Sequence, residues 1–427
     1  MASSTRRTVI TGLGVLSPIG QGREAYWQGL QTGRSGVRPL RAFDVASLPT
    51  KIGGEVQDFD AKKFIGKDHR KNLRVMARTI QLAVCAAQLA LDDAAIDKAK
   101  LDPTRFGVEF GSGLIATDLD ELAEAATVST NCAPGHVDLE KWGDLGLARI
   151  QPLWMLKYLP NMLACHVSII HNAQGPSNTI TESEVAGLLA LGEARRIIKR
   201  DVSDFFLVGG ADSRFNPLSM VRHCLFQPLS RRNDAPDKAV RPFDRDRDGT
   251  VIGEGAGVLA VEELGHAQQR GARIYAELVG FGSAFDKGRT GAGIARAIRA
   301  ALKDAGIGPE DIDHVNAHGL ASVQSDIWEA RGLQEVFGGA AQPMPVWAPK
   351  SYYGNLGAAG GLTELCGSVL AQQHGQVPVT LNYENPDPAC PLAIVAGSAA
   401  AVRKPYFVKV SFTDLGQCAA VVCRKWE

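Results

Sequence analysis

Short runs of apolar or β-branched residues alternate along the chain with longer segments in which apolar residues recur at a helical period. Residues 8–11, 106–110 and 205–208 are runs of the first kind, each closed by a glycine, and they predict buried strands. Residues 74–95 place apolar side chains at helical spacing and predict a long amphipathic helix. Continuously apolar strands are typical of sheets covered on both faces. The pattern therefore predicts an α/β fold with mainly parallel sheets.

One short pattern occurs twice in the chain. Residues 90–96 read ALDDAAI and residues 301–307 read ALKDAGI, almost half the chain apart. Each copy ends a predicted helix and leads into a strand closed by glycine, FGVEFGSG in the first half and IDHVNAHG in the second. We interpret this as an internal duplication of one α/β unit. Two such halves packed face to face would form one layered molecule.

Composition narrows the possible functions. The chain has 427 residues, in which 46 Lys and Arg balance 46 Asp and Glu, so a surface that follows nucleic-acid phosphates is not expected. No apolar run approaches the ~20 residues that span a bilayer, and the N-terminus lacks the apolar core of a secretory signal. We therefore expect a cytoplasmic protein without membrane association. None of the eight cysteines forms a C-x-x-C pair, so no metal or other cofactor is expected.

The first candidate site is the segment 175–194, GPSNTITESEVAGLLALGEA, which predicts a strand turning directly into a helix. The turn carries Glu182, Ser183 and Glu184 at the helix N-terminus, where backbone N–H groups can bind an oxyanion. The alternative is structural: Ser183 caps the helix and the acidic residues interact with its dipole. These residues alone favour capping.

Two further segments carry polar side chains at predicted element ends. His318, in HVNAHGL, follows a strand and precedes a glycine, a position where both a functional and a structural role are open. The segment PKSYYGNLGAAGG (349–361) places Lys350, an amide and a glycine-rich turn before a helix. That turn could hold a phosphate, but it lacks the Walker pattern.

These segments, in this order, resemble the elongating condensing enzymes, the type II β-ketoacyl-acyl carrier protein synthases. The resemblance covers nearly the whole chain. It implies a thiolase-like fold, which is a duplicated α/β unit in five layers, with halves at 1–262 and 263–427. It also implies an acyl carrier protein with a phosphopantetheine-bound acyl or malonyl group as partner, and a homodimer or a heterodimer with another ketosynthase. The matching segments are RRTVITGLGVLSPIG at the start, LPNM, GPS, VGGAD, RPFDRDRDGTVIGEGAGVLAVEE at 241–263, VNAHG and NYENPDP.

The resemblance also implies site residues, with departures from the family pattern. The family's nucleophilic cysteine falls on Glu184, its first histidine on His318, its lysine on Lys350 and its second histidine on Asn355. The family's phenylalanine-gated, glycine-rich loop reads SFTDLGQ at 411–417. Its acyl-pocket and gating residues here are Phe412, Asp414, Leu415 and Gly416.

Four functions remain open on these residues. The first is decarboxylation of a malonyl thioester, with His318 and Asn355 as donors to the enolate oxygen and with burial raising the pKa of Glu184 towards a neutral form. The second is general-base chemistry by Glu184 paired with His318. The third is a catalytically inactive partner subunit of an active ketosynthase, similar to a chain-length factor. The fourth and least supported is an esterase-like role for Ser183, because the G-x-S-x-G elbow is absent.

Overall fold

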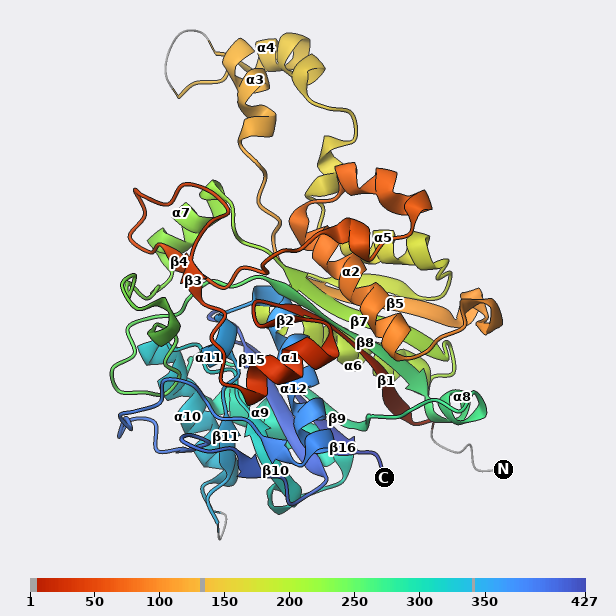
Figure 1. Ribbon diagram of the computed structural model, residues 1–427, viewed down its shortest axis with the longest axis vertical. Coiled ribbons are helices and arrows are strands. Elements are labelled where there is room, and N and C mark those ends of the chain that lie inside the picture. Colours follow the sequence, from red (N-terminus) through yellow and green to blue (C-terminus); the bar gives the residue numbers. More distant parts are fainter. Residues whose placement is uncertain (1–5, 131–134, 340–341) are drawn as a thin grey trace.

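The computed structural model describes residues 6–130, 135–339 and 342–427. Two sets of strands with the same spatial order form its main sheet system (Figure 1). The first set runs β1-β8-β7-β5-β6 and the second β9-β16-β15-β10-β11, with β13 (Ala393–Ile394) beside β11. The first set comprises β1 (Thr8–Ser17), β5 (Phe106–Ser112), β6 (Ser177–Ile180), β7 (Phe205–Asp212) and β8 (Gly255–Glu263). The second comprises β9 (Ala276–Phe285), β10 (Ile312–Asn316), β11 (Pro345–Trp347), β15 (Tyr406–Phe412) and β16 (Gln417–Lys425).

The direction of the strands differs from the sequence prediction. The pairs toward the two ends of the strand order, β5·β6, β5·β7, β10·β11 and β10·β15, are parallel, as expected. The pairs β1·β8, β7·β8, β9·β16 and β15·β16 are antiparallel, so the prediction of mainly parallel sheets is wrong. Continuous hydrophobicity reports burial on both faces, and helices cover both faces of these antiparallel strands as well.

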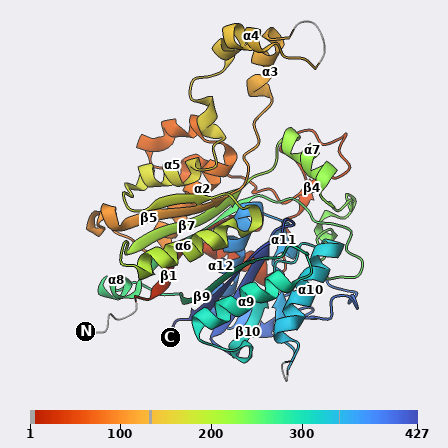
Figure 2. The ribbon, with the colours of Figure 1, turned by 180° about the vertical axis from the view of Figure 1, so that it is seen from behind.

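Helices and sheets alternate in five layers (Figures 1 and 2). Helices α2 (Arg78–Asp93) and α5 (Met162–His171) share an apolar core with the outer face of the first strand set. Helices α9 (Ala292–Ala305) and α10 (Val323–Phe337) do the same on the second set. Between the two sets lie α6 (Ala186–Lys199) and α12 (Gly360–His374). The order is therefore helix, sheet, helix, sheet, helix.

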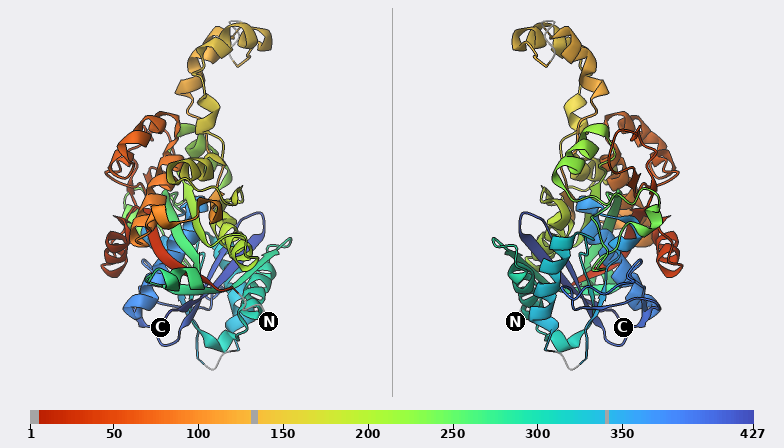
Figure 3. Two further views of the ribbon diagram at one scale, coloured as in Figure 1. Left: turned by 90° about the vertical axis from the view of Figure 1, so that its right-hand side faces the viewer. Right: turned by 90° about the vertical axis from the view of Figure 1, so that its left-hand side faces the viewer.

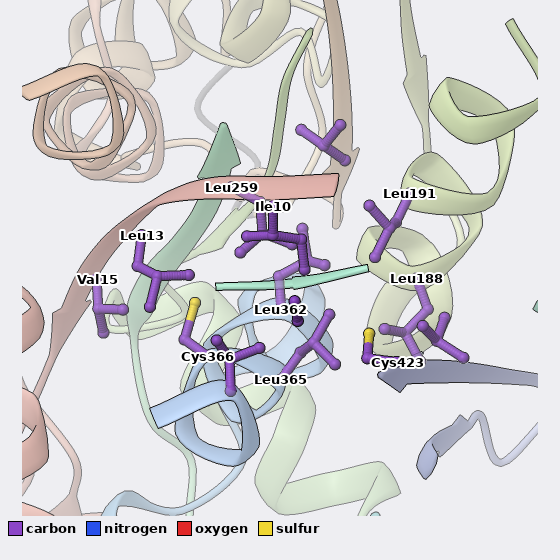
Figure 4. Close-up of a cluster of buried hydrophobic side chains, with 14 of the residues drawn as sticks. Ile10, Leu13, Val15, Leu188, Leu191, Leu259, Leu362, Leu365, Cys366 and Cys423 are labelled. Carbon is purple, nitrogen blue, oxygen red and sulfur yellow. The ribbon is translucent and has the colours of Figure 1, made fainter. Parts of the chain in front are cut away.

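The middle layer is held by one large apolar cluster (Figure 4). Leu188 and Leu191 of α6 and Leu362 and Leu365 of α12 are fully buried against strand residues such as Leu259. Burial of each such side chain stabilises the fold by about 1.5–3 kcal/mol relative to exposure. This packing fixes the start of α6, where the first candidate site lies.

The sequence repeat falls on equivalent parts of the two strand sets. ALDDAAI overlaps the end of α2, which leads to β5, and ALKDAGI overlaps the end of α9, which leads to β10. Helix α2 begins at Arg78 rather than near Arg74, because residues 67–75 form a 3-10 helix. The other predicted elements lie within a few residues of their expected bounds.

Smaller helices and strands lie outside the five layers. Residues 113–130 and 135–160 project from one end of the molecule and carry α3 (Asp120–Val128) and α4 (Leu139–Lys141) (Figure 1; side views in Figure 3). Within the described residues, no helix is both long enough and apolar enough to cross a membrane. The cysteine at position 132 lies outside the described residues. The remaining elements are α1 (Arg23–Gln31), α7 (Pro217–Phe226), α8 (Leu264–Gln269), α11 (Lys350–Tyr353), β2 (Gly20–Gln21), β3 (Arg38–Pro39), β4 (Ile52–Gly53), β12 (Gln376–Val377) and β14 (Ala400–Ala401).

A buried acid in β5 makes stability depend on pH. Glu109 is 1% exposed, and in the part of the chain that the structure describes its Oε2 has no hydrogen-bond partner. Burial, followed by the charge of Glu193, raises its pKa from 4.5 to about 7. The folded protein therefore keeps a proton that the unfolded chain releases in this window, and stability falls as pH rises through it.

Glu109→Gln is expected to remove this pH dependence. Above the window, the variant should be more stable than the wild type by on the order of 2 kcal/mol. Denaturant unfolding on both sides of the window measures the effect, with the exposed Glu140→Gln as control. An unchanged pH profile in Glu109→Gln would show that this carboxyl does not titrate there.

Candidate functional site

The turn between β6 and α6 holds the first candidate residues. Residues 183–185 form one turn of 3-10 helix, and Ser183 adopts a left-handed backbone conformation with φ of 48°. The Ser183 side chain makes no capping hydrogen bond. Its Oγ instead accepts a hydrogen bond from Arg214 Nη2 at 3.2 Å. Ser183 is therefore not the helix cap. Its side chain also hydrogen-bonds the Glu184 carboxylate, which is not the imidazole that activates an esterase serine.

Glu184 is a buried acid with two donors on one oxygen. It is 8% exposed, and its Oε1 accepts from Asn355 Nδ2 at 3.1 Å and from Arg214 Nη2 at 3.3 Å. Burial by itself would raise the pKa, but the Arg214 charge and the hydrogen bonds of Ser183 and Asn355 bring it below its usual value. The expectation of a raised pKa is therefore wrong, and Glu184 is ionised at neutral pH.

Arg214 connects Glu184 to a second buried acid. Its Nε donates to Asp212 Oδ2 at 3.0 Å, and both side chains are less than a tenth exposed. Burial and the charge of Glu184 raise the pKa of Asp212, whereas Arg214 opposes this rise. Glu184, Arg214 and Asp212 thus form a trio of buried charged groups. With both acids ionised the trio carries one net negative charge, which disfavours a third anion beside it.

His318 belongs to a separate buried ionic group. Its Nδ1 lies 3.0 Å from Lys350 Nζ, and Lys350 forms a 2.8 Å ion pair with Glu364, which also binds Lys409. The backbone N–H groups of His318 and Gly319 donate to Glu329 of α10 at 2.6 and 2.7 Å. These contacts fix the imidazole at the end of β10.

The state of the His318 ring follows from these partners. Burial and the charges of Lys350 and Lys409 lower its pKa well below the usual value, so the ring is neutral. An ammonium group can only donate, so Nδ1 accepts from Lys350 and the ring proton is on Nε2. This Nε2 is buried and has no partner within the described residues. No hydrogen bond joins His318 to Glu184, so the expected general-base pair is not formed.

Asn355 lies in the glycine-rich turn before α12. Its Oδ1 accepts from the Gly357 backbone at 3.0 Å, while its Nδ2 donates to Glu184. Gly357 has a φ of +55°, and a Cβ there would come within 2.1 Å of Asp212 Oδ2. The turn therefore packs directly against Asp212, and position 357 requires glycine.

The loop between β15 and β16 supplies the gating candidates. The Phe412 ring lies 4.6 Å from the His318 ring, and Asp414 Oδ1 accepts from Ser325 Oγ at 3.2 Å. Burial, and then the charge of Glu184, raise the pKa of Asp414. Leu415 is exposed and Gly416 has a φ of 107°, so these two form the outer part of the turn.

A small cavity brings part of this set together. It has a volume of about 20 Å³, which is enough for roughly one water molecule. His318 and Lys350 are not among its lining residues, although His318 packs against Phe412, which is. The lining residues are Glu184, Gln227, Pro228, Thr250, Leu320, Ser322, Ser325, Asn355, Phe412 and Asp414.

Sequence reasoning missed the charged partners of this site. Arg214 pairs with both Glu184 and Asp212, and Glu364 pairs with both Lys350 and Lys409. The only sequence signal for Asp212 and Arg214 is that two charged residues lie four and six positions after the apolar run 205–208. Glu364 and Lys409 lie inside segments that otherwise predict a buried helix and a buried strand.

Two family models together match most of the chain. The model described as Beta-ketoacyl synthase, N-terminal domain, matches residues 5–267, and the corresponding C-terminal domain matches 275–384. The chain is 36% identical to a 3-oxoacyl-[acyl-carrier-protein] synthase 2 of Synechocystis over 99% of both proteins, and 36% identical to that of Coxiella burnetii over 95% of both. It therefore belongs to the β-ketoacyl synthase family.

Solved structures agree with this assignment. The ishigamide ketosynthase/chain length factor superposes with a TM-score of 0.86 at 32% identity, covering 99% of this chain and 100% of the other. A β-ketoacyl synthase from Burkholderia phymatum gives 0.88 at 30% identity with the same coverage. The thiolase-like fold in five layers, expected from the resemblance, is thus confirmed. The boundaries at 262 and 263 stay a prediction.

Proposed function

We propose that this protein is a non-condensing member of its family that serves as the partner subunit of a cysteine-containing ketosynthase, similar to a chain-length factor. The observation that carries the proposal is the state of Glu184, a buried, ionised carboxylate bound by Arg214 and Asn355. Condensation needs a thiolate that accepts the acyl group. A carboxylate would form a mixed anhydride, which is too reactive to hold a growing chain.

The space around Glu184 supports the same function. The cavity of about 20 Å³ does not accommodate an acyl chain. Asn355, which would have to donate to a developing oxyanion, already donates to Glu184. One of the two Asn355 amide hydrogens is therefore already used, and a substrate would have to displace side chains before any chemistry.

An exposed sheet edge supports association with a second chain. β6 ends the strand order of the first set and exposes Ser177 and Asn178, which leaves backbone groups available for another strand. Large apolar side chains are exposed nearby in the chain, within 114–119 and 137–155 and on α5, and such residues mark interaction surfaces. They are Leu114, Leu119, Val137, Leu139, Leu145, Leu147, Leu153, Met155 and Ile169.

The proposed partners are an active ketosynthase and an acyl carrier protein. One similar structure is titled as a type II polyketide synthase acyl-carrier protein in complex with its ketosynthase, with a TM-score of 0.86 and 30% identity. In this chain, residues 62–74 present a row of exposed cations that suits the phosphate of a phosphopantetheine arm. They are Lys62, Lys63, Lys67, Arg70, Lys71 and Arg74.

Co-expression with a cysteine-containing ketosynthase from the same genome tests the proposal. We expect a stable heterodimer that condenses acyl- and malonyl-carrier protein. Activity should survive Glu184→Ala in this chain and disappear when the partner's nucleophilic cysteine is replaced by alanine. Condensation that persists without the partner's cysteine, or the absence of any complex, would contradict the partner-subunit function.

Decarboxylation of malonyl thioesters is a second candidate, favoured by one observation. The buried Nε2–H of neutral His318 has no protein partner among the described residues, and such a donor can stabilise an enolate oxygen. Ionised Glu184 opposes this reaction, because it repels the malonate carboxylate.

If decarboxylation occurs, two variants should change its rate in opposite directions. Glu184→Gln should retain or raise the rate, because it removes the repelling charge and keeps the side-chain shape. His318→Ala should lower the rate about 10²–10³-fold. Mass spectrometry of the carrier-bound product measures both. A loss of activity in Glu184→Gln would instead indicate proton transfer by Glu184.

A further inference from the structure

Arg214 is a buried cation that the sequence motifs did not single out. It follows β7 by two residues, yet its guanidinium turns back to contact three acceptors. Nη2 reaches Glu184 Oε1 and Ser183 Oγ, and Nε reaches Asp212 Oδ2. The side chain is 8% exposed, so these contacts hold the cation inside the protein beside the turn of residues 182–184.

The guanidinium is tightly enclosed on its other sides. A Cβ at Gly357 would lie 2.4 Å from Arg214 Nη2, so the group rests directly on the backbone of the turn before α12. On the α7 side, burial and then the charge of Arg214 lower the pKa of His223 to about 4.

Stability alone does not account for this arrangement. Arg214 Nη1 is buried with no hydrogen-bond partner among the described residues, and two acids, Glu184 and Asp212, surround this one cation. Unsatisfied donors and unbalanced charges in the interior are costly, and apolar residues of similar volume are often more stabilising. A function that needs this space filled by a charged group is therefore a better explanation.

The residues that line the cavity show where the Arg214 side chain lies relative to it. Glu184 and Asn355 line it but Arg214 does not, so Glu184 stands between the cavity and the guanidinium. We propose that Arg214 is a specificity-determining residue that fills the space beyond position 184 and excludes acyl chains longer than acetyl. The inference rests on the proposed function in one respect, namely that position 184 corresponds to the family's acyl-carrying residue.

A thiol at position 184 makes the excluded space measurable. Glu184→Cys and Glu184→Cys/Arg214→Ala would each be incubated with acetyl and hexanoyl thioesters of N-acetylcysteamine. Transfer moves the acyl carbonyl from the probe sulfur to the thiolate introduced at position 184 and releases N-acetylcysteamine, which takes up the proton. Intact-protein mass spectrometry measures the rates, and Glu184→Ser corrects for labelling of the native cysteines.

We expect the ratio of hexanoyl to acetyl labelling to be at least ~10-fold higher in the variant without Arg214. Glu184→Cys/Arg214→Lys, which keeps a long cation, should restore the low ratio. Glu184→Cys/Arg222→Ala, which removes an exposed arginine of α7, should leave the ratio unchanged. A general loss of structure would also expose the thiol and raise the ratio, so Glu184→Cys/Arg214→Ala must first show the same cooperative unfolding transition as Glu184→Cys.

Two results would overturn the inference: an equal ratio with and without Arg214, or no hexanoyl labelling in a folded variant that lacks it. If removal of Arg214 alone prevents folding, Asp212→Asn added to Glu184→Cys/Arg214→Ala leaves no ion of the trio and permits the same comparison. The experiment uses this chain alone, so its result is independent of whether a heterodimer forms.

Discussion

Arg214→Gln is expected to lower the free energy of unfolding by about 3–5 kcal/mol, as for other buried ion pairs that lose one partner. The variant leaves Asp212 and Glu184 buried with no cation between them. Glu184→Gln should cost much less, because it leaves a neutral Asp212–Arg214 pair. Denaturant unfolding at neutral pH measures both values.

The control for this comparison is an exposed ion pair of the same kind. Arg149 lies 2.8 Å from Glu124, and both side chains are more than half exposed. Arg149→Gln should therefore change the stability by less than about 1 kcal/mol. Equal costs for Arg214→Gln and Glu184→Gln would contradict the charge assignment of the trio.

Glu364→Gln is expected to have a comparable cost, because it leaves two buried lysines without their shared carboxylate. Lys350 and Lys409 are 1% and 0% exposed, and both pair with Glu364. We expect a loss of about 3–5 kcal/mol near neutral pH. The exposed Glu335→Gln, which removes a surface partner of Arg299, is the matched control.

The pH dependence of this variant identifies the cause. Burial lowers the pKa of Lys409 from 10.5 to about 8, even with Glu364 present. A folded protein that sheds a proton more easily than the unfolded chain gains stability as pH rises through this window. The cost of Glu364→Gln should therefore shrink at alkaline pH. A cost that does not change with pH would point to lost packing instead.

Much of the fold was predictable from local patterns. Apolar runs closed by glycine located β5 and β7, and the repeated heptapeptide located the equivalent ends of α2 and α9. Strand direction was not predictable, because hydrophobicity reports burial and not chain direction. The antiparallel pairing of β8 and β16 depends on how distant segments return to the sheet.

The candidate site was also predictable only in part from the sequence. The positions of Glu184, Asn355, Phe412 and Asp414 came from the resemblance, and they line one cavity. The pKa of Glu184 was expected to be raised, but it is lowered. Its burial could be anticipated, but its pairing with Arg214 depends on a contact across 30 positions in sequence that no periodicity reveals.

The most direct test of the central claim is to incubate the purified chain alone with acyl- and malonyl-carrier protein and to weigh both proteins by intact mass spectrometry. A non-condensing subunit predicts unchanged masses: no acyl group on this chain, no β-ketoacyl-carrier protein and no acetyl-carrier protein. A covalent acyl adduct or an elongated product would contradict the claim. Conversion of malonyl- to acetyl-carrier protein would also contradict it and would assign decarboxylation instead.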